Sequence, residues 1–213
     1  MLLRDALARF YDRLTRNDPV APADIIIVMA GSMERKRYGI ALYRSGIAPR
    51  LLLSVARFEV SKMRLLESPE IDAGELFLLR DRTPPRDRHF FLDIDERGCR
   101  IERVPLPAWN TWGESVGIER HLNPKAVRRA MVVSTGAHLE RVARAFARVF
   151  GKQLEFSFCA VPDDLSSVHR EGWWTRSEDR RFVLKEAAKL AGYRLILPMP
   201  DPLIRRLMSL GPR

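Results

Sequence analysis

The stretch MVVSTGAHLERVARAF, Met131 to Phe146, joins an apolar strand pattern directly to an amphipathic helix pattern. Within it, Leu139, Val142 and Ala143 recur with Phe146 at the spacing of one helix face, which is the face that a helix turns toward a core. The junction STGAH, between strand and helix, holds two hydroxyls, a glycine and an imidazole. A strand that leads straight into a helix indicates an α/β fold.

The same alternation of strand and helix occurs elsewhere in the chain. ADIIIVMAGS (23–32) has the continuous apolar run of a parallel strand buried on both faces. A helical segment, MERKRYGIALYRSG (33–46), follows and closes at Gly46, a typical C-cap glycine. Because strand–helix–strand units build parallel sheets, we predict a single Rossmann-like α/β domain over residues 1–213, a three-layer sandwich with a mainly parallel sheet. Its parallel strands are expected near Ile25–Met29, Arg50–Ser54, Ala130–Ser134 and Leu154–Ala160.

Residues 57–104 interrupt this alternation, and they are predicted to be an insertion or an addition at the sheet edge. HFFLDIDERGCRIERV (89–104) alternates apolar and polar residues on both sides of Glu96-Arg97-Gly98, which predicts a β-hairpin with the glycine in its turn. The proline-rich RTPPRDR (82–88) before it indicates a loop.

Charge and composition narrow the classes of partner. The formal net charge is +10, but lysine supplies only six of the 37 basic residues and the arginines are spread along the chain. Nucleic acid is therefore not the expected partner, and a basic nucleic-acid-binding protein stays open only as the least favoured alternative. The two cysteines lack disulfide or metal spacing, and no apolar run approaches the ~20 residues of a membrane-spanning helix. We expect a soluble, cytoplasmic protein without a signal peptide. The basic, apolar PLIRRLMSLGPR (202–213) leaves a peripheral membrane contact open, and the oligomeric state is open as well.

Polar residues follow the predicted strands at the edge where open α/β sheets bind ligands, beyond the carboxyl ends of the strands. They are Gly31, Ser32 and Arg35 after the first strand, Ser54 after the second, and Ser134, Thr135, Gly136 and His138 after a later one. Helix N-termini at this edge offer unpaired N–H groups that suit phosphate or carboxylate. Gly136 would permit close backbone approach, and His138 would donate to an anion or move a proton. Metal-ligand spacing and phosphate-binding glycine motifs are absent from the sequence.

The same residues have a purely structural alternative. Serine and threonine are ordinary helix N-caps, each of which stabilises a helix by about 1 kcal/mol. The glycine can be needed only to avoid a steric clash, and a histidine in the first turn of a helix is often solvated. In NTWGES, Asn110 to Ser115, the residues Thr111 and Glu114 stand at the spacing of a capping box.

Four segments stand in an order that is similar to a bacterial family without an agreed reaction. They are ADIIIVMAGSMERKRYGIALYRSGIAPRLLLS, NTWGES, MVVSTGAHLERVARAF and the terminal GWW…LKEAAKLAGYRL. On these segments the chain resembles the YdcF-like family, which includes ElyC and SanA, over most of its length except the middle region. The residues that match the family motifs are Asp24, Gly31 and Arg35, then Asn110, Thr111 and Glu114, and finally Ser134 or Thr135 with His138 and Arg141.

The resemblance implies a Rossmann-like fold, a role of some members in the cell envelope, and a ligand site at the same sheet edge. His138, whose ordinary pKa lies near neutrality, and Glu114 are the catalytic candidates, while Asn110 and Thr111 would orient the substrate. Arg35 and Arg141 would hold an anion bidentately. The expected partner is an anionic, phosphate-bearing small molecule, either a nucleotide or an envelope lipid-phosphate precursor, or an S-adenosylmethionine-like ligand. The sequence does not identify a cofactor.

Departures from the family pattern leave the activity open. Ala108 stands where the family has a serine, Pro105 stands at its acidic position, Val55 follows Ser54 in place of a glycine, and Ala137 replaces an aromatic residue. The alternative to an enzyme is therefore a ligand-binding or regulatory module without catalysis.

The resemblance also predicts a geometry. Arg35, His138 and Arg141 should converge with NTWGES on one cleft beyond the strand ends. Like charges so placed are unfavourable unless an opposite charge compensates them. Glu114 is the only acidic residue in these motifs able to do so, which leaves room for an anionic ligand.

Overall fold

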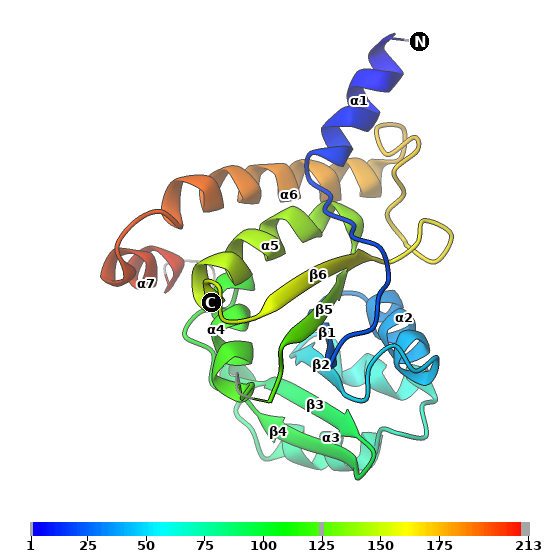
Figure 1. The fold of residues 1–213 in the computed structure, drawn as a ribbon, viewed down its shortest axis with the longest axis vertical. Helices are drawn as coiled ribbons and strands as arrows, with labels where there is room; N and C mark the ends of the chain where they lie inside the picture. The colour runs from blue at the N-terminus through cyan, green and yellow to red at the C-terminus, as the bar shows by residue number, and fades with distance from the viewer. Residues whose placement is uncertain (1, 124–125, 210–213) are drawn as a thin grey trace.

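The computed structural model describes residues 2–123 and 126–209. Its strands form one six-stranded sheet in the order β4-β3-β2-β1-β5-β6 (Figure 1). The strands are β1 (Ile25–Val28), β2 (Leu51–Ala56), β3 (His89–Asp95), β4 (Gly98–Arg103), β5 (Arg129–Ser134) and β6 (Glu155–Ala160). β2, β1, β5 and β6 are parallel, whereas β3 is antiparallel to both β2 and β4. The predicted α/β, Rossmann-like architecture is confirmed.

Helices cover both faces of the sheet, because alternate residues of each buried strand point to opposite sides. The helices are α1 (Leu2–Asp12), α2 (Met33–Arg44), α3 (Ala73–Asp81), α4 (Thr111–His121), α5 (Gly136–Phe150), α6 (Ser177–Ile196) and α7 (Asp201–Ser209), with the short 3-10 helices η1 (Val60–Leu66) and η2 (Pro85–Asp87). α2 and α3 pack on the face that carries Ile26, and α4 and α5 pack on the face that carries Ile27. The result is a three-layer sandwich.

Three helices within the described residues, α1, α6 and α7, lie outside these layers. α6 crosses the outer side of α5, and α1 stands near the first turns of α6 (Figure 1). A separate apolar cluster joins them, with Tyr11 from α1, Ala137 from α5 and Val183 from α6. None of the helices within residues 2–123 and 126–209 has the length and apolar character needed to cross a membrane. The end of the basic tail, from residue 210 onward, lies outside the described residues.

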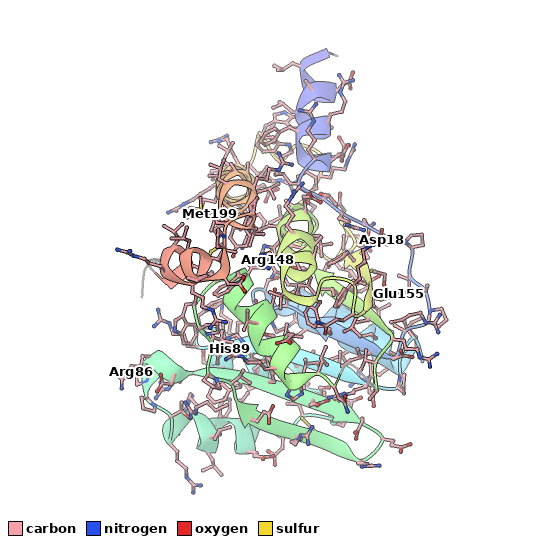
Figure 2. The ribbon with its side chains drawn as sticks, turned by 60° about the vertical axis from the view of Figure 1, so that its left-hand side comes forward. Asp18, Arg86, His89, Arg148, Glu155 and Met199 are labelled. Carbon is pink, nitrogen blue, oxygen red and sulfur yellow. The ribbon has the colours of Figure 1, made fainter. Side chains whose placement is uncertain are left out.

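The middle region is an addition at the sheet edge. β3 pairs with β2 in a register that runs from Leu51 opposite Ile94 to Ala56 opposite His89. Gly98, with φ +123°, follows the turn of the β3–β4 hairpin as the first residue of β4. Because β3 runs antiparallel, its first residue lies beside the carboxyl end of β2. Figure 2 shows this residue, His89, within the body of the protein, where it is 2% exposed.

We predict that the contact between α2 and β1 tolerates no added carbon at Gly39. A Cβ there would lie 2.2 Å from Val28 Cγ2, so Gly39→Ala should lower the free energy of unfolding by about 1–3 kcal/mol. Gly192→Ala is the matched control in α6, because no described atom lies within 4 Å of its added carbon. The control should be neutral or stabilising by up to about 1 kcal/mol. Urea unfolding measures both variants, and equal effects would contradict this packing.

Candidate functional site

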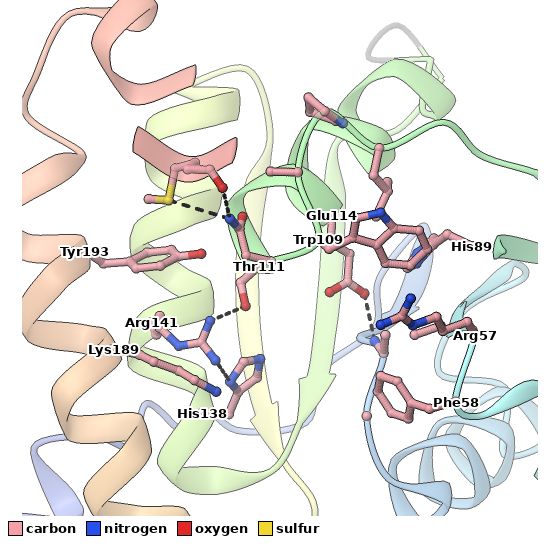
Figure 3. A pocket seen from close by; sticks show the side chains of 18 of the residues that line it. Arg57, Phe58, His89, Trp109, Thr111, Glu114, His138, Arg141, Lys189 and Tyr193 are labelled. Atoms are coloured by element: carbon pink, nitrogen blue, oxygen red, sulfur yellow. Dashed lines mark hydrogen bonds between the residues drawn. The ribbon is translucent and has the colours of Figure 1, made fainter. Parts of the chain in front are cut away.

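A pocket of about 820 Å³ lies beyond the carboxyl ends of β1 and β2. From β1 the chain adds β2, β3 and β4 on one side of the sheet and then β5 and β6 on the other. β1 is therefore at the topological switch point, where open α/β sheets bind ligands. Of the residues singled out from the sequence, those that line it are Gly31, Arg35, Asn110, Thr111, Glu114, His138 and Arg141 (Figure 3). Arg35, His138 and Arg141 therefore converge with NTWGES on one cleft, although they come from distant parts of the chain.

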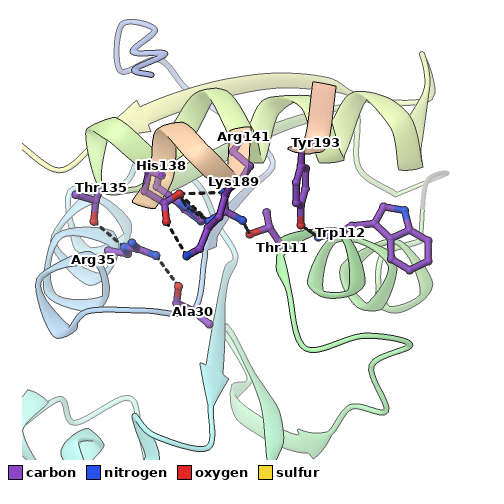
Figure 4. Close-up of polar contacts among 10 residues, drawn as sticks. Ala30, Arg35, Thr111, Trp112, Thr135, His138, Arg141, Lys189 and Tyr193 are labelled. Carbon is purple, nitrogen blue, oxygen red and sulfur yellow. Dashed lines mark hydrogen bonds and ion pairs between the residues drawn. The ribbon is translucent and has the colours of Figure 1, made fainter. Parts of the chain in front are cut away.

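Arg35 is buried and held against the backbone turn that follows β1. Its Nη1 donates to the Ala30 carbonyl, and its Nε donates to Thr135 Oγ1 at 2.8 Å (Figure 4). Gly31 makes room for the guanidinium, because a Cβ at this position would lie 2.3 Å from Arg35 Nη1. The φ of Gly31 is +148°, which also favours glycine. Thr135 is thus a support for Arg35 and does not itself line the pocket.

Arg141, in α5, connects three helices through its guanidinium. Its Nε and Nη2 donate to Glu186 Oε2 of α6 at 2.9 and 2.7 Å, and its Nη1 donates to the hydroxyl of Thr111 in α4. Arg141 is 5% exposed and Glu186 is 4% exposed. Burial raises the pKa of Glu186, but the hydrogen bond from His138 and the Arg141 charge outweigh it and hold this pKa well below its usual range. The pair is therefore ionised and shielded from water.

His138 is fixed through one ring nitrogen. Its Nδ1 lies 2.8 Å from Arg141 Nη2 and 3.0 Å from Glu186 Oε2. Nε2 is left to meet a ligand: it donates when Nδ1 accepts from Arg141, and it accepts when Nδ1 donates to Glu186. Burial and the Arg141 charge lower the pKa of His138 to about 3. The ordinary histidine pKa near neutrality therefore does not apply to His138. The ring is neutral at pH 7, and it is buried where a solvated side chain was the structural alternative.

Glu114 joins α4 to the end of β1. Its Oε1 accepts from the Ala30 backbone N–H at 2.7 Å, so it does not return to its own helix terminus as a capping box requires. Asn110 is the N-cap, and its Oδ1 accepts from the Gly113 N–H at 3.0 Å. The capping-box alternative for Thr111 and Glu114 is therefore wrong.

Other predicted ligand contacts lie outside the pocket wall. Ser54 Oγ is hydrogen-bonded to His89 Nε2 at 2.9 Å. Ser134 is the last residue of β5, and its buried Oγ has no hydrogen-bond partner among the described residues. Ser32 is the N-cap residue of α2 and is half-buried. Ser54 and Ser134 are fully buried, and neither they nor Ser32 are among the residues that line the pocket. These three predictions of direct contact are not met.

Gly136 is covered by the chain's own N-terminal segment. A Cβ at Gly136 would lie 3.0 Å from the Tyr11 phenol oxygen and 3.5 Å from Thr15. Tyr11 is 3% exposed and packs against Ala137. Gly136 does permit a close approach, as expected, but the approaching group is Tyr11. The expectation that a ligand meets this helix N-terminus is corrected, because a segment far away in sequence already occupies it.

α6 supplies pocket residues that were not among the predicted site residues, although most of them lie in the LKEAAKLAGYRL segment (184–195) of the family resemblance. They are Glu186, Lys189 and Tyr193, with Phe182 beside them. Tyr193 places its ring 5.3 Å from the Arg141 guanidinium and accepts from the Trp112 N–H at 3.0 Å. The buried positions of α6 are Asp179, Val183, Glu186, Leu190 and Tyr193. A carboxylate on an apolar helix face needs a buried partner, and this spacing is the signal by which Glu186 could have been found.

Basic side chains outnumber acidic ones around the pocket. Among the described residues that line it, the basic ones are Arg35, Arg57, Arg86, Arg141 and Lys189, and the acidic ones are Asp87, Glu114 and Glu186. Five cations against three carboxylates leave a formal excess of two positive charges. The expectation that Glu114 alone compensates the arginines is wrong, because Glu186 pairs with Arg141. The positive excess nevertheless persists.

Neither a metal cluster nor a relative defines the site. Within the described residues, no group of three or more His, Cys, Asp or Glu side chains is placed to hold a metal ion. Comparison with protein-family models, with curated proteins and with solved structures finds no match. The geometry and charge of the pocket are therefore the basis for the function proposed below.

We predict that Glu186→Gln destabilises the fold strongly. The substitution keeps the side-chain shape but leaves the buried Arg141 guanidinium without its counter-charge, which costs about 3 kcal/mol or more. Glu178→Gln is the matched control, because Glu178 is exposed on the first turn of the same helix; it should change stability by less than about 0.5 kcal/mol. Urea unfolding at pH 7 measures both, and a small effect of Glu186→Gln would show that Arg141 is not buried as described.

We also predict that the protein loses stability as the pH falls from 7.5 to 5.5. Burial lowers the pKa of both His89 and His138 to about 3. In this window the unfolded chain binds a proton at each histidine, near pKa 6.5, and the folded chain does not. Each histidine therefore lowers the free energy of unfolding by about 1.4 kcal/mol as the pH falls by these two units. Unfolding free energies of His89→Gln and His138→Gln should each have a correspondingly flatter pH dependence, and unchanged slopes would contradict the prediction.

Proposed function

We propose that the protein binds a phosphate-bearing small molecule in the pocket beyond the ends of β1 and β2. The observation that carries the proposal is the excess of two positive charges around this pocket. A net excess of one sign of charge around a cleft attracts ligands of the opposite sign. The volume of about 820 Å³ suits a ligand of metabolite size.

Arg35 is the residue that we assign to the phosphate. Its hydrogen bonds to Ala30 and Thr135 use Nη1 and Nε, so Nη2 is the part of the guanidinium left for a ligand oxygen. Lys189 of α6 pairs with Glu186 Oε1 at 3.0 Å, but its side chain is 54% exposed and keeps donors for a ligand as a second cation. The nitrogens of Arg141 are already engaged by Glu186, Thr111 and His138. We therefore assign Arg141 to positioning His138.

His138 is assigned the proton-handling role. A neutral imidazole held through Nδ1 offers Nε2 to the pocket as a hydrogen-bond donor to phosphate. To accept a proton from a ligand hydroxyl or water, the ring needs the negative charge of a bound phosphate, which raises the histidine pKa. The YdcF-like resemblance supports the same site, because most of the residues that match the family motifs line one pocket; Asp24, Ser134 and Thr135 do not. We propose membership of that family on this ground.

A ligand-binding module without catalysis is the second candidate, and Ala108 favours it. This residue lines the pocket at the position where the resemblance places a serine. A methyl group supplies neither a nucleophile nor a proton. The two candidates differ in turnover, which phosphorus NMR follows directly: an enzyme changes the spectrum of a bound phosphate ester, and His138→Gln abolishes the change. A binding module leaves the spectrum of the ester unchanged.

We predict that Arg35→Gln weakens phosphate binding selectively. The substitution removes a charge-assisted contact, so affinity for pyrophosphate should fall about tenfold or more. Isothermal titration of the full chain with pyrophosphate, at low salt, measures the effect.

Arg37→Gln is the matched control for this experiment. Arg37 lies two positions along the same helix but is exposed, with one weak contact to the Leu65 carbonyl at 3.4 Å. Its substitution changes the net charge by the same amount as Arg35→Gln and should leave affinity within about twofold of the wild type. Equal losses of affinity in the two variants would indicate general charge attraction and would contradict the assignment of Arg35 to the phosphate.

A further inference from the structure

The rim of the pocket carries two exposed aromatic side chains that the proposed function does not use. Phe58, after β2, is 61% exposed, and Trp109, before α4, is 39% exposed. Both line the pocket, and Figure 3 shows them across it from His138 and Arg141. Large aromatic groups gathered at the mouth of a pocket mark a surface that a ligand covers.

A buried imidazole beside Trp109 has a ring nitrogen without a partner. His89 is 2% exposed, and its Nε2 is occupied by Ser54 Oγ at 2.9 Å. Its Nδ1 is buried and has no hydrogen-bond partner among the described residues. Phe91 and Trp109 fix the ring edge-on, at centroid distances of 5.7 and 5.9 Å. Because an unpaired buried polar atom is unfavourable and His89 lines the pocket, a ligand group is the natural partner for Nδ1.

The loop that presents Phe58 is fixed by a buried ion pair. Glu59 Oε2 accepts from the Ala56 N–H at 2.9 Å, and its Oε1 pairs with Lys36 Nζ at 2.5 Å. The side chains of Glu59 and Lys36 are 1% and 0% exposed. The exposure of Phe58 is therefore a property of an anchored loop.

Arg57, on the same loop, adds a planar cation to this rim. Its guanidinium lies 5.6 Å from the centroid of the Trp109 ring. Guanidinium and indole planes are both surfaces on which aromatic rings stack. The rim thus combines stacking planes with the ring nitrogen of His89, while the phosphate-binding groups lie elsewhere in the same pocket.

We propose that this rim is a nucleobase subsite, so that the phosphate-bearing ligand is a nucleotide. The inference rests on the proposed function, in which Arg35 meets the phosphate. A nucleobase has a π face for Trp109 and edge groups that donate or accept toward His89 Nδ1. The aliphatic chain of a lipid phosphate has neither, and it would leave Nδ1 unpaired.

Calorimetric titration of the full chain with three kinds of phosphate ester tests the subsite. The probes are the four ribonucleoside 5′-monophosphates, ribose 5-phosphate and geranyl phosphate. The tightest nucleotide should bind about tenfold more strongly than ribose 5-phosphate, because one stacked base contributes that much. Trp109→Leu and Phe58→Leu should each remove most of this difference without weakening ribose 5-phosphate. Trp174→Leu is the matched control, since Trp174 is half-buried and lies outside the pocket.

Nitrogen-15 NMR of the histidine rings gives a readout that needs no substitution. The nucleotide should shift the His89 Nδ1 resonance, whereas inorganic phosphate should shift the His138 ring alone.

The outcomes separate this inference from the proposed function. Equal affinity for nucleotides and ribose 5-phosphate, or tighter binding of geranyl phosphate, would overturn the nucleobase subsite and leave phosphate binding intact. Failure of all three kinds of ester to bind would overturn the proposed function and the nucleotide assignment with it.

Discussion

A buried carboxylate, that of Glu186, is the interaction on which the ligand edge depends. A buried arginine is unfavourable in a water-free site unless an anion lies against it. Glu186 Oε2 accepts from Arg141 and lies within hydrogen-bond distance of His138 Nδ1. Because Arg141 also donates to Thr111, one carboxylate ties α6 to α5 and, through α5, to the start of α4. This wall of the pocket is a single electrostatic unit built from three helices.

The pocket is therefore completed by contacts that are long-range in sequence. Arg35 and its partner Thr135 are 100 residues apart, and Arg141 and Glu186 are 45 apart. The sheet and its flanking helices provide Arg35 and His138, but α6 lies outside those layers, across α5 (Figure 1). The C-terminal part of the chain thus belongs to the site as much as the strands do, although it contributes no strand.

Local patterns in the sequence predict the sheet well, since the parallel strands are short, largely apolar runs and the β3–β4 hairpin alternates apolar and polar residues around its turn. Of the junction residues that they place at the ligand edge, Arg35 and His138 line the pocket, whereas Ser32, Ser54 and Ser134 do not. Glu114 is expected there from the family resemblance. Local patterns do not predict contacts that depend on packing between elements far apart in the sequence. Nothing near Gly136 indicates that Tyr11 covers it. Nothing near Glu186 indicates its partners, although its place on an apolar helix face indicates that it has some.

The close fit between Gly31 and Arg35 has an evolutionary consequence. Any side chain at position 31 would occupy the space of the Arg35 guanidinium, within 2.3 Å of Nη1. A relative that loses the arginine is free of this steric restriction, although the φ of +148° at position 31 still favours glycine, whereas a relative that keeps the arginine must keep the glycine. The two positions should therefore covary as a pair among related sequences, and the coupling is directional: glycine without arginine is permitted, but arginine without glycine is not.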